Sequence, residues 1–122
     1  MGPKGKMAKI QITELALRTI IGTNEWERKA KQDIVINVTL EYNSTKSCRT
    51  DHLQDAIDYK RLTKRIIREV EHSRFFLLEA LAGFVLKIIM EEKRIKRAAV
   101  RIDKPQALRF AKSVSVELES KR

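Results

Sequence analysis

The sequence lacks the better-known catalytic motifs, so any catalysis must use acidic, basic or phenolic side chains. There is no GxxxxGKS/T or GxGxxG phosphate loop and no GxSxG nucleophile elbow. The two histidines, His52 and His72, form no HExxH or HxH metal pattern. The one cysteine, Cys48, cannot form an internal disulfide or a CxxC metal pair. We therefore expect no metal site, and the candidates that remain are two glutamates, a tyrosine and a lysine.

The two glutamates lie in segments where a carboxylate could have a chemical role. Glu27 follows Trp26 in a polar stretch, and a carboxylate held against an aromatic wall is partly desolvated, which raises its pKa. A solvated acidic loop is the simpler interpretation, and the spacing favours it. Glu79 lies in the apolar run FFLLEAL near an expected helix start, where free amides stabilise a carboxylate. It could also bind two N–H donors of a ligand at once.

The tyrosine and the lysine are ambiguous when each is taken alone. Tyr59 opens an expected helix on its apolar side, which is also typical of a core tyrosine. Lys104 precedes Pro105 at the end of an expected strand, and most lysines in such places point into water. Neither residue identifies an enzyme.

The elements that must position these four residues follow from the hydrophobic periodicity. Period-2 alternation predicts strands, the first with a bulge near Thr13–Glu14, and apolar spacing of three and four predicts helices. The strands are expected at 10–21, 34–42, 98–102 and 114–118, and the helices at 59–70, with Asp58 as its cap, and 76–92. The order ββααββ predicts an α+β fold, in which an antiparallel four-stranded sheet carries both helices on one face.

The composition indicates one globular domain, with 122 residues of which 43% are hydrophobic and 34% charged. We place this domain at residues 9–120 and expect the basic segment 1–8 to be a flexible leader. No apolar run is long enough to span a bilayer, and a lone cysteine suits a reducing compartment. We therefore expect a cytoplasmic protein without a membrane partner.

The formal net charge of +10 has two interpretations. It is either ordinary surface solubility or the mark of an anionic partner, such as nucleic acid or a phosphorylated small molecule. Aromatic residues make up only 6% of the chain and are not interleaved with the basic runs, which counts against a base-stacking platform.

Four short segments, in order, resemble the dihydroneopterin aldolase family. They are Ile21–Arg28 (IGTNEWER), Asp58-Tyr59, Leu77-Leu78-Glu79 and Lys104-Pro105, and the resemblance extends over nearly all of 10–118. It implies the tunnelling fold (T-fold), in which monomers close into rings and two tetrameric rings stack into a homo-octamer. It also implies a small-molecule pterin substrate bound between subunits, no cofactor and no nucleic-acid partner.

The family has two close branches, and the sequence favours one of them. The aldolase releases glycolaldehyde from dihydroneopterin in folate biosynthesis, and its sister enzyme is the dihydroneopterin triphosphate 2′-epimerase. Residues 32–39 (QDIVINVT) and 102–116 resemble the epimerase branch, whereas Trp26-Glu27-Arg28 is closer to the aldolase. The resemblance therefore favours the epimerase, the aldolase is the alternative, and a basic nucleic-acid-binding module is a remote third.

The resemblance also implies roles for individual residues. Glu79 would anchor the amino and ring N–H groups of the pterin, with groups around Leu78 and Ile57 completing the pocket. Lys104 and Tyr59 would transfer protons at the side-chain hydroxyls of the substrate. Glu27 would come from an adjoining subunit and order that region. A triphosphate would need cations, and the candidates are Arg18, Arg28, Lys31, Arg101, Arg109 and Lys112.

Overall fold

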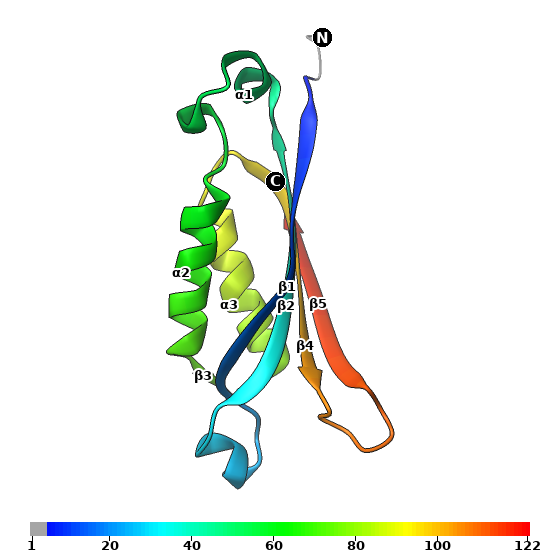
Figure 1. Cartoon of the computed structure of the whole chain (residues 1–122). Helices are drawn as coiled ribbons and strands as arrows, with labels where there is room; N and C mark the ends of the chain where they lie inside the picture. Colours follow the sequence, from blue (N-terminus) through cyan, green and yellow to red (C-terminus); the bar gives the residue numbers. More distant parts are fainter. Residues whose placement is uncertain (1–4) are drawn as a thin grey trace.

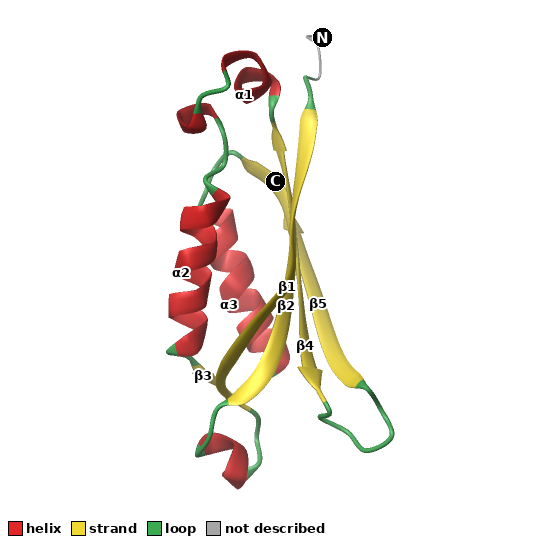
Figure 2. Cartoon of the chain, viewed as in Figure 1, coloured by secondary structure: helices red, strands yellow, loops and turns green. Residues whose placement is uncertain are grey.

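A five-stranded sheet and a layer of helices form the molecule in a computed structural model, which describes residues 5–122 (Figures 1 and 2). The strands are β1 (Met7–Ile21), β2 (Gln32–Asn43), β3 (Arg74–Phe75), β4 (Ile95–Pro105) and β5 (Ser113–Lys121). The helices are α1 (Thr45–Thr50), α2 (Tyr59–Glu71) and α3 (Leu78–Met90), with short 3₁₀ turns at Glu25–Arg28 and Leu53–Asp55. Within the described residues, no helix has the length and apolarity needed to cross a membrane.

The sheet has the order β3-β1-β2-β4-β5, and α2 and α3 cover the same face of it, as predicted (Figure 1). The four long strands pair antiparallel. The predicted four-strand, two-helix pattern is incomplete, because β3 pairs parallel with β1 and α1 forms in the polar stretch after β2. Two residues are too few to show alternation, and a six-residue polar helix shows no apolar face, so neither element could be recognised.

The first strand begins earlier than the sequence predicted. Met7 and Ala8 pair with Asn43 and Tyr42, so the end of the segment 1–8 is strand and not leader. The carbonyl of Lys6 accepts hydrogen bonds from the backbone N–H and the hydroxyl of Ser44, each at 2.7 Å. These bonds use backbone groups that the side-chain pattern does not reveal. Residues 1–4 of the expected leader lie outside the described residues.

The predicted bulge in β1 is confirmed. The register between β1 and β2 shifts between Ile12 and Leu15, and Glu14 has a φ of 55°. The Glu14 N–H bonds the Asn37 side-chain oxygen at 2.8 Å, which satisfies a donor that the bulge takes out of the ladder. The bulge lets apolar side chains on both sides of it face the helices.

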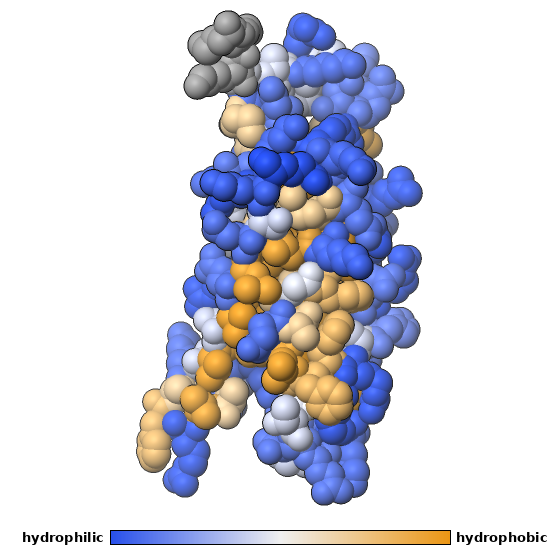
Figure 3. Space-filling model, turned by 180° about the vertical axis from the view of Figure 1, so that it is seen from behind, coloured by the Kyte–Doolittle hydropathy of each residue, from blue (hydrophilic) through white to orange (hydrophobic). Residues whose placement is uncertain are grey.

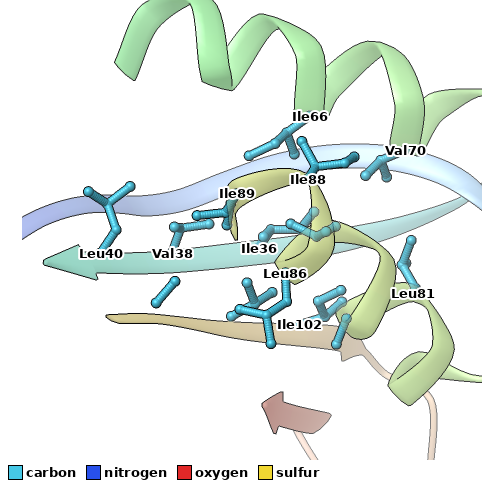
Figure 4. Close-up of a cluster of buried hydrophobic side chains, with 14 of the residues drawn as sticks. Ile36, Val38, Leu40, Ile66, Val70, Leu81, Leu86, Ile88, Ile89 and Ile102 are labelled. Carbon is cyan, nitrogen blue, oxygen red and sulfur yellow. The ribbon is translucent and has the colours of Figure 1, made fainter. Parts of the chain in front are cut away.

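The core lies between the sheet and the two long helices (Figure 4). It includes Ile34, Ile36, Val38 and Leu40 of β2, Ile66 and Val70 of α2, Leu81, Val85 and Ile89 of α3, and Val100 and Ile102 of β4. Asp58 caps α2 as predicted, since its carboxylate accepts a hydrogen bond from the Arg61 N–H at 3.0 Å. This packing holds the two long helices against the sheet and so sets where the residues at their ends lie relative to the strand ends.

Candidate active site

A buried carboxylate, Glu27, is the centre of a hydrogen-bonded cluster at one end of the sheet. It lies in the 3₁₀ turn between β1 and β2 and is 4% exposed. Its Oε1 accepts from the Asn24 N–H at 3.1 Å, and its Oε2 accepts from the Gln32 side-chain amide at 3.1 Å. Oε2 also forms an ion pair with the Lys104 ammonium of β4, which is itself largely buried. The cluster joins residues 77 positions apart in the chain.

The local sequence explains why this turn can hold a carboxylate. Gly22 has a φ of +127°, a conformation that L side chains rarely adopt. A Cβ at Gly22 would also overlap the Glu27 carboxylate. The Asn24 N–H donates to the Glu27 carboxylate at 3.1 Å, and the Glu27 N–H donates to the Asn24 backbone carbonyl at 3.0 Å, so the two residues close the turn. Sequence reasoning missed Gly22, Asn24 and Gln32 as supports of Glu27, although the Asn-x-x-Glu spacing was a visible signal.

The pKa of Glu27 moves in the opposite direction to the one considered from sequence. Burial alone would raise it, but hydrogen bonds from Lys104, Asn24 and Gln32 outweigh burial and lower the pKa from 4.5 to about 2. Trp26 supplies no enclosing wall, because it is 62% exposed. Glu27 is therefore a permanent anion near neutral pH, and it can hold a cation but cannot donate a proton.

This pKa predicts a loss of stability in acid that depends on Glu27. A carboxylate with a lowered folded-state pKa stabilises the protein fully above its ordinary value of 4.5, and this contribution is lost as the pH falls toward about 2. We expect Glu27→Gln to lower the free energy of unfolding by roughly 2–3 kcal/mol near neutral pH, with the difference shrinking below about pH 4. Urea unfolding of wild type and variant across this range measures it.

Glu25→Gln is the matched control for the acid experiment. Glu25 is in the same turn, but its side chain is 91% exposed and its ion pair with Lys29 is 3.9 Å long. Its removal should leave the pH dependence unchanged. Parallel stability curves for wild type and Glu27→Gln would contradict the lowered pKa.

The first turn of α3, which carries Glu79, lies at the same end of the molecule as the β1–β2 turn and the end of β4 (Figure 1). It is exposed in the first turn of α3, directly after the half-buried Leu78. The segment before it is held beside the Glu27 turn, since β3 pairs with the end of β1 and the Gly22 N–H bonds the Phe75 carbonyl at 3.3 Å. The structure thus places three of the four candidate residues at one end of the molecule.

Tyr59 lies at the opposite end. It is 51% exposed at the start of α2, and Ile57, just before it, is buried. The 13 residues of α2 span about 20 Å at about 1.5 Å per residue. A groove of about 650 Å³ between α2 and α3 is lined by Ile57 and by basic side chains of α2, and Glu27, Glu79 and Lys104 do not line it. One chain therefore holds Tyr59 and Lys104 too far apart to act together.

The structure pairs Glu27 with a residue of its own chain. Glu27, which we predicted to act in a neighbouring subunit's pocket, forms its ion pair with Lys104 of the same chain. The two segments meet because β2 pairs with both β1 and β4, which places the β1–β2 turn beside the end of β4. Within one chain, Tyr59 is the candidate residue that is remote from Lys104.

The six basic residues proposed for a triphosphate fall into two groups. Arg18 pairs with Asp33 at 3.1 Å and Arg101 with Asp103 at 3.0 Å, while the Arg28 guanidinium bonds backbone carbonyls. Among the described residues, the other three form no salt bridge; they are Lys31, Arg109 and Lys112. Arg109 and Lys112 belong to the loop that follows Lys104, so they are the free cations of the β4–β5 loop.

Several large apolar side chains are exposed to solvent in the segments near the Glu27–Lys104 pair. The exposed ones there are Trp26, Phe76, Leu77, Leu108 and Phe110, and Phe110 is fully exposed. Figure 3 shows apolar side chains along the middle of one face and on the projecting loop. Contiguous exposed apolar surface of this kind usually marks a binding surface for a ligand or another chain.

Comparison with known proteins decides the family. A family model described as FolB, dihydroneopterin aldolase, matches residues 10–119. The chain belongs to the dihydroneopterin aldolase family. This membership confirms the resemblance predicted from the four sequence segments, and the family's members include aldolases and epimerases.

Relatives from both branches cover most of the chain. It is 47% identical over 115 residues to a dihydroneopterin triphosphate 2′-epimerase of Escherichia coli K12, covering 94% of this chain and 96% of the relative. It is 43% identical over 116 residues to the Pseudomonas aeruginosa epimerase, covering 95% and 94%. Identity to the E. coli dihydroneopterin aldolase is 26% over 108 residues, covering 88% of each chain.

A solved member of the family has the same fold. The structure of E. coli dihydroneopterin aldolase in complex with neopterin matches with a TM-score of 0.87 at 25% identity, covering 93% of this chain and 98% of the other. The α+β class predicted from sequence is therefore confirmed, whereas the predicted four-stranded sheet is a five-stranded one.

Proposed function

We propose that this chain is a dihydroneopterin triphosphate 2′-epimerase. The observation that carries the proposal is its greater identity to the two epimerases than to the aldolase, over nearly the whole chain. The Glu27–Lys104 pair beside Glu79 supplies the groups that such a reaction needs. Dihydroneopterin aldolase activity is the second candidate, supported by the likeness to the aldolase bound to neopterin. Family membership leaves the nucleic-acid module without support.

The proposed reaction is a retro-aldol cleavage followed by an aldol addition. Removal of the proton from the 2′-hydroxyl lets the C1′–C2′ bond break, and its electron pair moves into the C=N group of the dihydropterin ring. The 2′ carbon becomes an aldehyde carbon. If the aldehyde fragment turns and C1′ attacks its other face, the 2′ configuration inverts. If the fragment leaves, the outcome is the aldolase reaction. The substrate supplies its own electron acceptor, and the protein supplies positioning and proton transfer.

The structure supports distinct roles for the polar residues. Glu79 is exposed at a helix start, where its carboxylate can bind two pterin N–H donors. Lys104, as a neutral amine, would accept the proton of the 2′-hydroxyl and return a proton when the aldol addition re-forms the bond, together with Tyr59 of a neighbouring subunit. Glu27 stays ionised and holds the Lys104 ammonium in place, so it acts on the substrate through Lys104.

We propose that the active form is a closed ring of subunits, two of which stack into an octamer. Two features support closure in addition to the distance between Tyr59 and Lys104. The outer edge of β1 is paired only at Ile20 and Ile21, and within the described residues the outer edge of β5 has no partner. Open edges of this length favour pairing with another chain.

Product analysis separates the two candidate reactions. Purified protein is incubated with dihydroneopterin and, separately, with its triphosphate, and the 2′-epimer and glycolaldehyde are measured. The 2′-epimer of the triphosphate as main product supports the epimerase. Glycolaldehyde as main product from the free pterin would reverse the branch choice, and no conversion of either substrate would reject the proposed function.

The free cations of the β4–β5 loop predict a substrate-dependent effect. Lys112 is near the site, because Lys104 pairs with Val114 and the Lys112 carbonyl accepts from the Gln106 N–H at 3.0 Å. Replacing both Arg109 and Lys112 with alanine should raise the KM for the triphosphate about tenfold, a loss of about 1.4 kcal/mol of binding, with no change for dihydroneopterin. Steady-state kinetics with both substrates measure it.

Arg101→Ala is the control for the loop variant. Arg101 is equally basic and on β4, but its guanidinium already pairs with Asp103. Its removal should leave both KM values within about twofold. Equal KM changes for the two substrates in the loop variant would show that the loop does not recognise phosphates.

A further inference from the structure

The guanidinium of Arg28 connects two segments that carry different parts of the site. Its Nη1 donates to the Gly22 carbonyl at 3.1 Å and to the Phe75 carbonyl at 2.9 Å, and its Nη2 donates to the Arg74 carbonyl at 2.5 Å. Its Cζ lies 3.9 Å from the centroid of the Phe76 ring. In return, the Arg74 guanidinium donates to the Arg28 carbonyl at 3.0 Å. Four of these contacts tie two segments 46 to 48 positions apart, and the bond to Gly22 braces the first segment itself.

Each of these segments ends in a functional group. Arg28 directly follows Glu27, whose carboxylate holds Lys104. Phe75 and Phe76 lead into α3, whose first turn presents Glu79. Only the two residue pairs of β1 with β3 and the Gly22–Phe75 bond otherwise join these segments through the backbone. Core packing of α3 against β4 sets the general position of Glu79, and the Arg28 side chain adds the contacts that tie the segment just before it to the Glu27 turn.

We infer that Arg28 is a positioning residue of this site, which sets the pterin anchor Glu79 at a fixed place relative to the proton-transferring Lys104. The inference rests on the proposed function. It also corrects the expectation that Arg28 is a triphosphate contact, because its N–H donors are used on three backbone carbonyls. Arginine suits the role, since a planar guanidinium can bond several acceptors in its plane while one face stacks on an aromatic ring. Lysine has a point charge and cannot reproduce that geometry.

Arg28→Lys tests the inference while keeping the charge. We expect kcat to fall at least about tenfold with both dihydroneopterin and its triphosphate, because small misplacements of reacting groups are costly. Since the Glu27 turn also loosens, we expect the pKa of the Glu27 carboxyl to rise from about 2 toward 4.5. Steady-state kinetics and carboxyl-carbon NMR titration of Glu27 measure the two effects, and far-UV circular dichroism checks that the variant is folded.

Arg74→Lys is the matched control, because Arg74 is on the other segment of the same contact but donates one hydrogen bond and stacks on nothing in the described residues. It should change kcat by less than about threefold. Unchanged kcat and unchanged Glu27 titration in Arg28→Lys would overturn the inference. A rise in KM for the triphosphate alone would overturn it too, because that result makes Arg28 a phosphate contact. If the wild type converted neither substrate, the proposed function would fail, and the Glu27 titration alone would decide whether Arg28 positions the turn.

Discussion

Replacing Lys104 with alanine should lower kcat for the proposed substrate by about 10²–10⁴-fold, the usual contribution of a positioned proton-transfer group. Lys104 is the one ammonium that Glu27 holds at the site, and the ion pair fixes where its protons point. The KM should change little, since the proposed pterin anchor, Glu79, is intact in this variant. Steady-state kinetics with the triphosphate measure both constants.

A loss of activity in this variant could also arise from instability. Breaking a buried ion pair by removing one partner costs about 3–5 kcal/mol, because it leaves the other charge unpaired. The double variant Glu27→Gln/Lys104→Met removes both charges and should recover most of that stability, yet remain inactive. If Lys104→Ala kept most of the wild-type kcat, Lys104 would not carry the proton transfer.

Mixing two inactive variants should restore activity if the site lies between subunits. Tyr59→Phe removes only a hydroxyl from an exposed side chain, and we expect it to lower kcat about 10²-fold without disturbing the helix. In oligomers reassembled from equal amounts of Tyr59→Phe and Lys104→Ala chains, about a quarter of the sites would receive an intact tyrosine and an intact lysine from different chains. Activity after mixed unfolding and refolding measures the recovery.

The control for this experiment pairs Lys104→Ala with Glu79→Ala. If one chain supplies both residues to a site, no mixture of these two variants gives a site with both intact. Recovery in the first mixture and none in the second would show that Tyr59 alone comes from the neighbour. Recovery in both mixtures would mean that Glu79 and Lys104 also meet across an interface.

Much of the architecture could be predicted because it depends on side-chain periodicity. The alternation from Ile34 to Leu40 predicted β2, the slip between Ile12 and Leu15 predicted the bulge, and Asp58 predicted the start of α2. Elements that depend on backbone pairing alone, such as β3, leave no such pattern.

The candidate site could be proposed from the sequence as a set of residues but not as a geometry. Four residues followed from the family resemblance, yet their grouping depends on strand pairing across 77 positions, which spacing does not reveal. The direction of the shift in the Glu27 pKa depends on three hydrogen-bond donors. One of them, Lys104, is remote from Glu27 in sequence, so the sequence did not reveal it. Periodicity also placed Tyr59 at a helix start without showing that the helix carries it away from Lys104.

Because α2 separates Tyr59 from Lys104, the proposed site would make the activity depend on protein concentration. If each chain carries two half-sites at opposite ends, a free monomer has no complete site, and an open row of chains has one site fewer than it has members. Only a closed ring gives every chain a working site. Specific activity would then fall when the protein is diluted below the dissociation constant of the ring, because the ring dissociates by mass action while each chain remains folded.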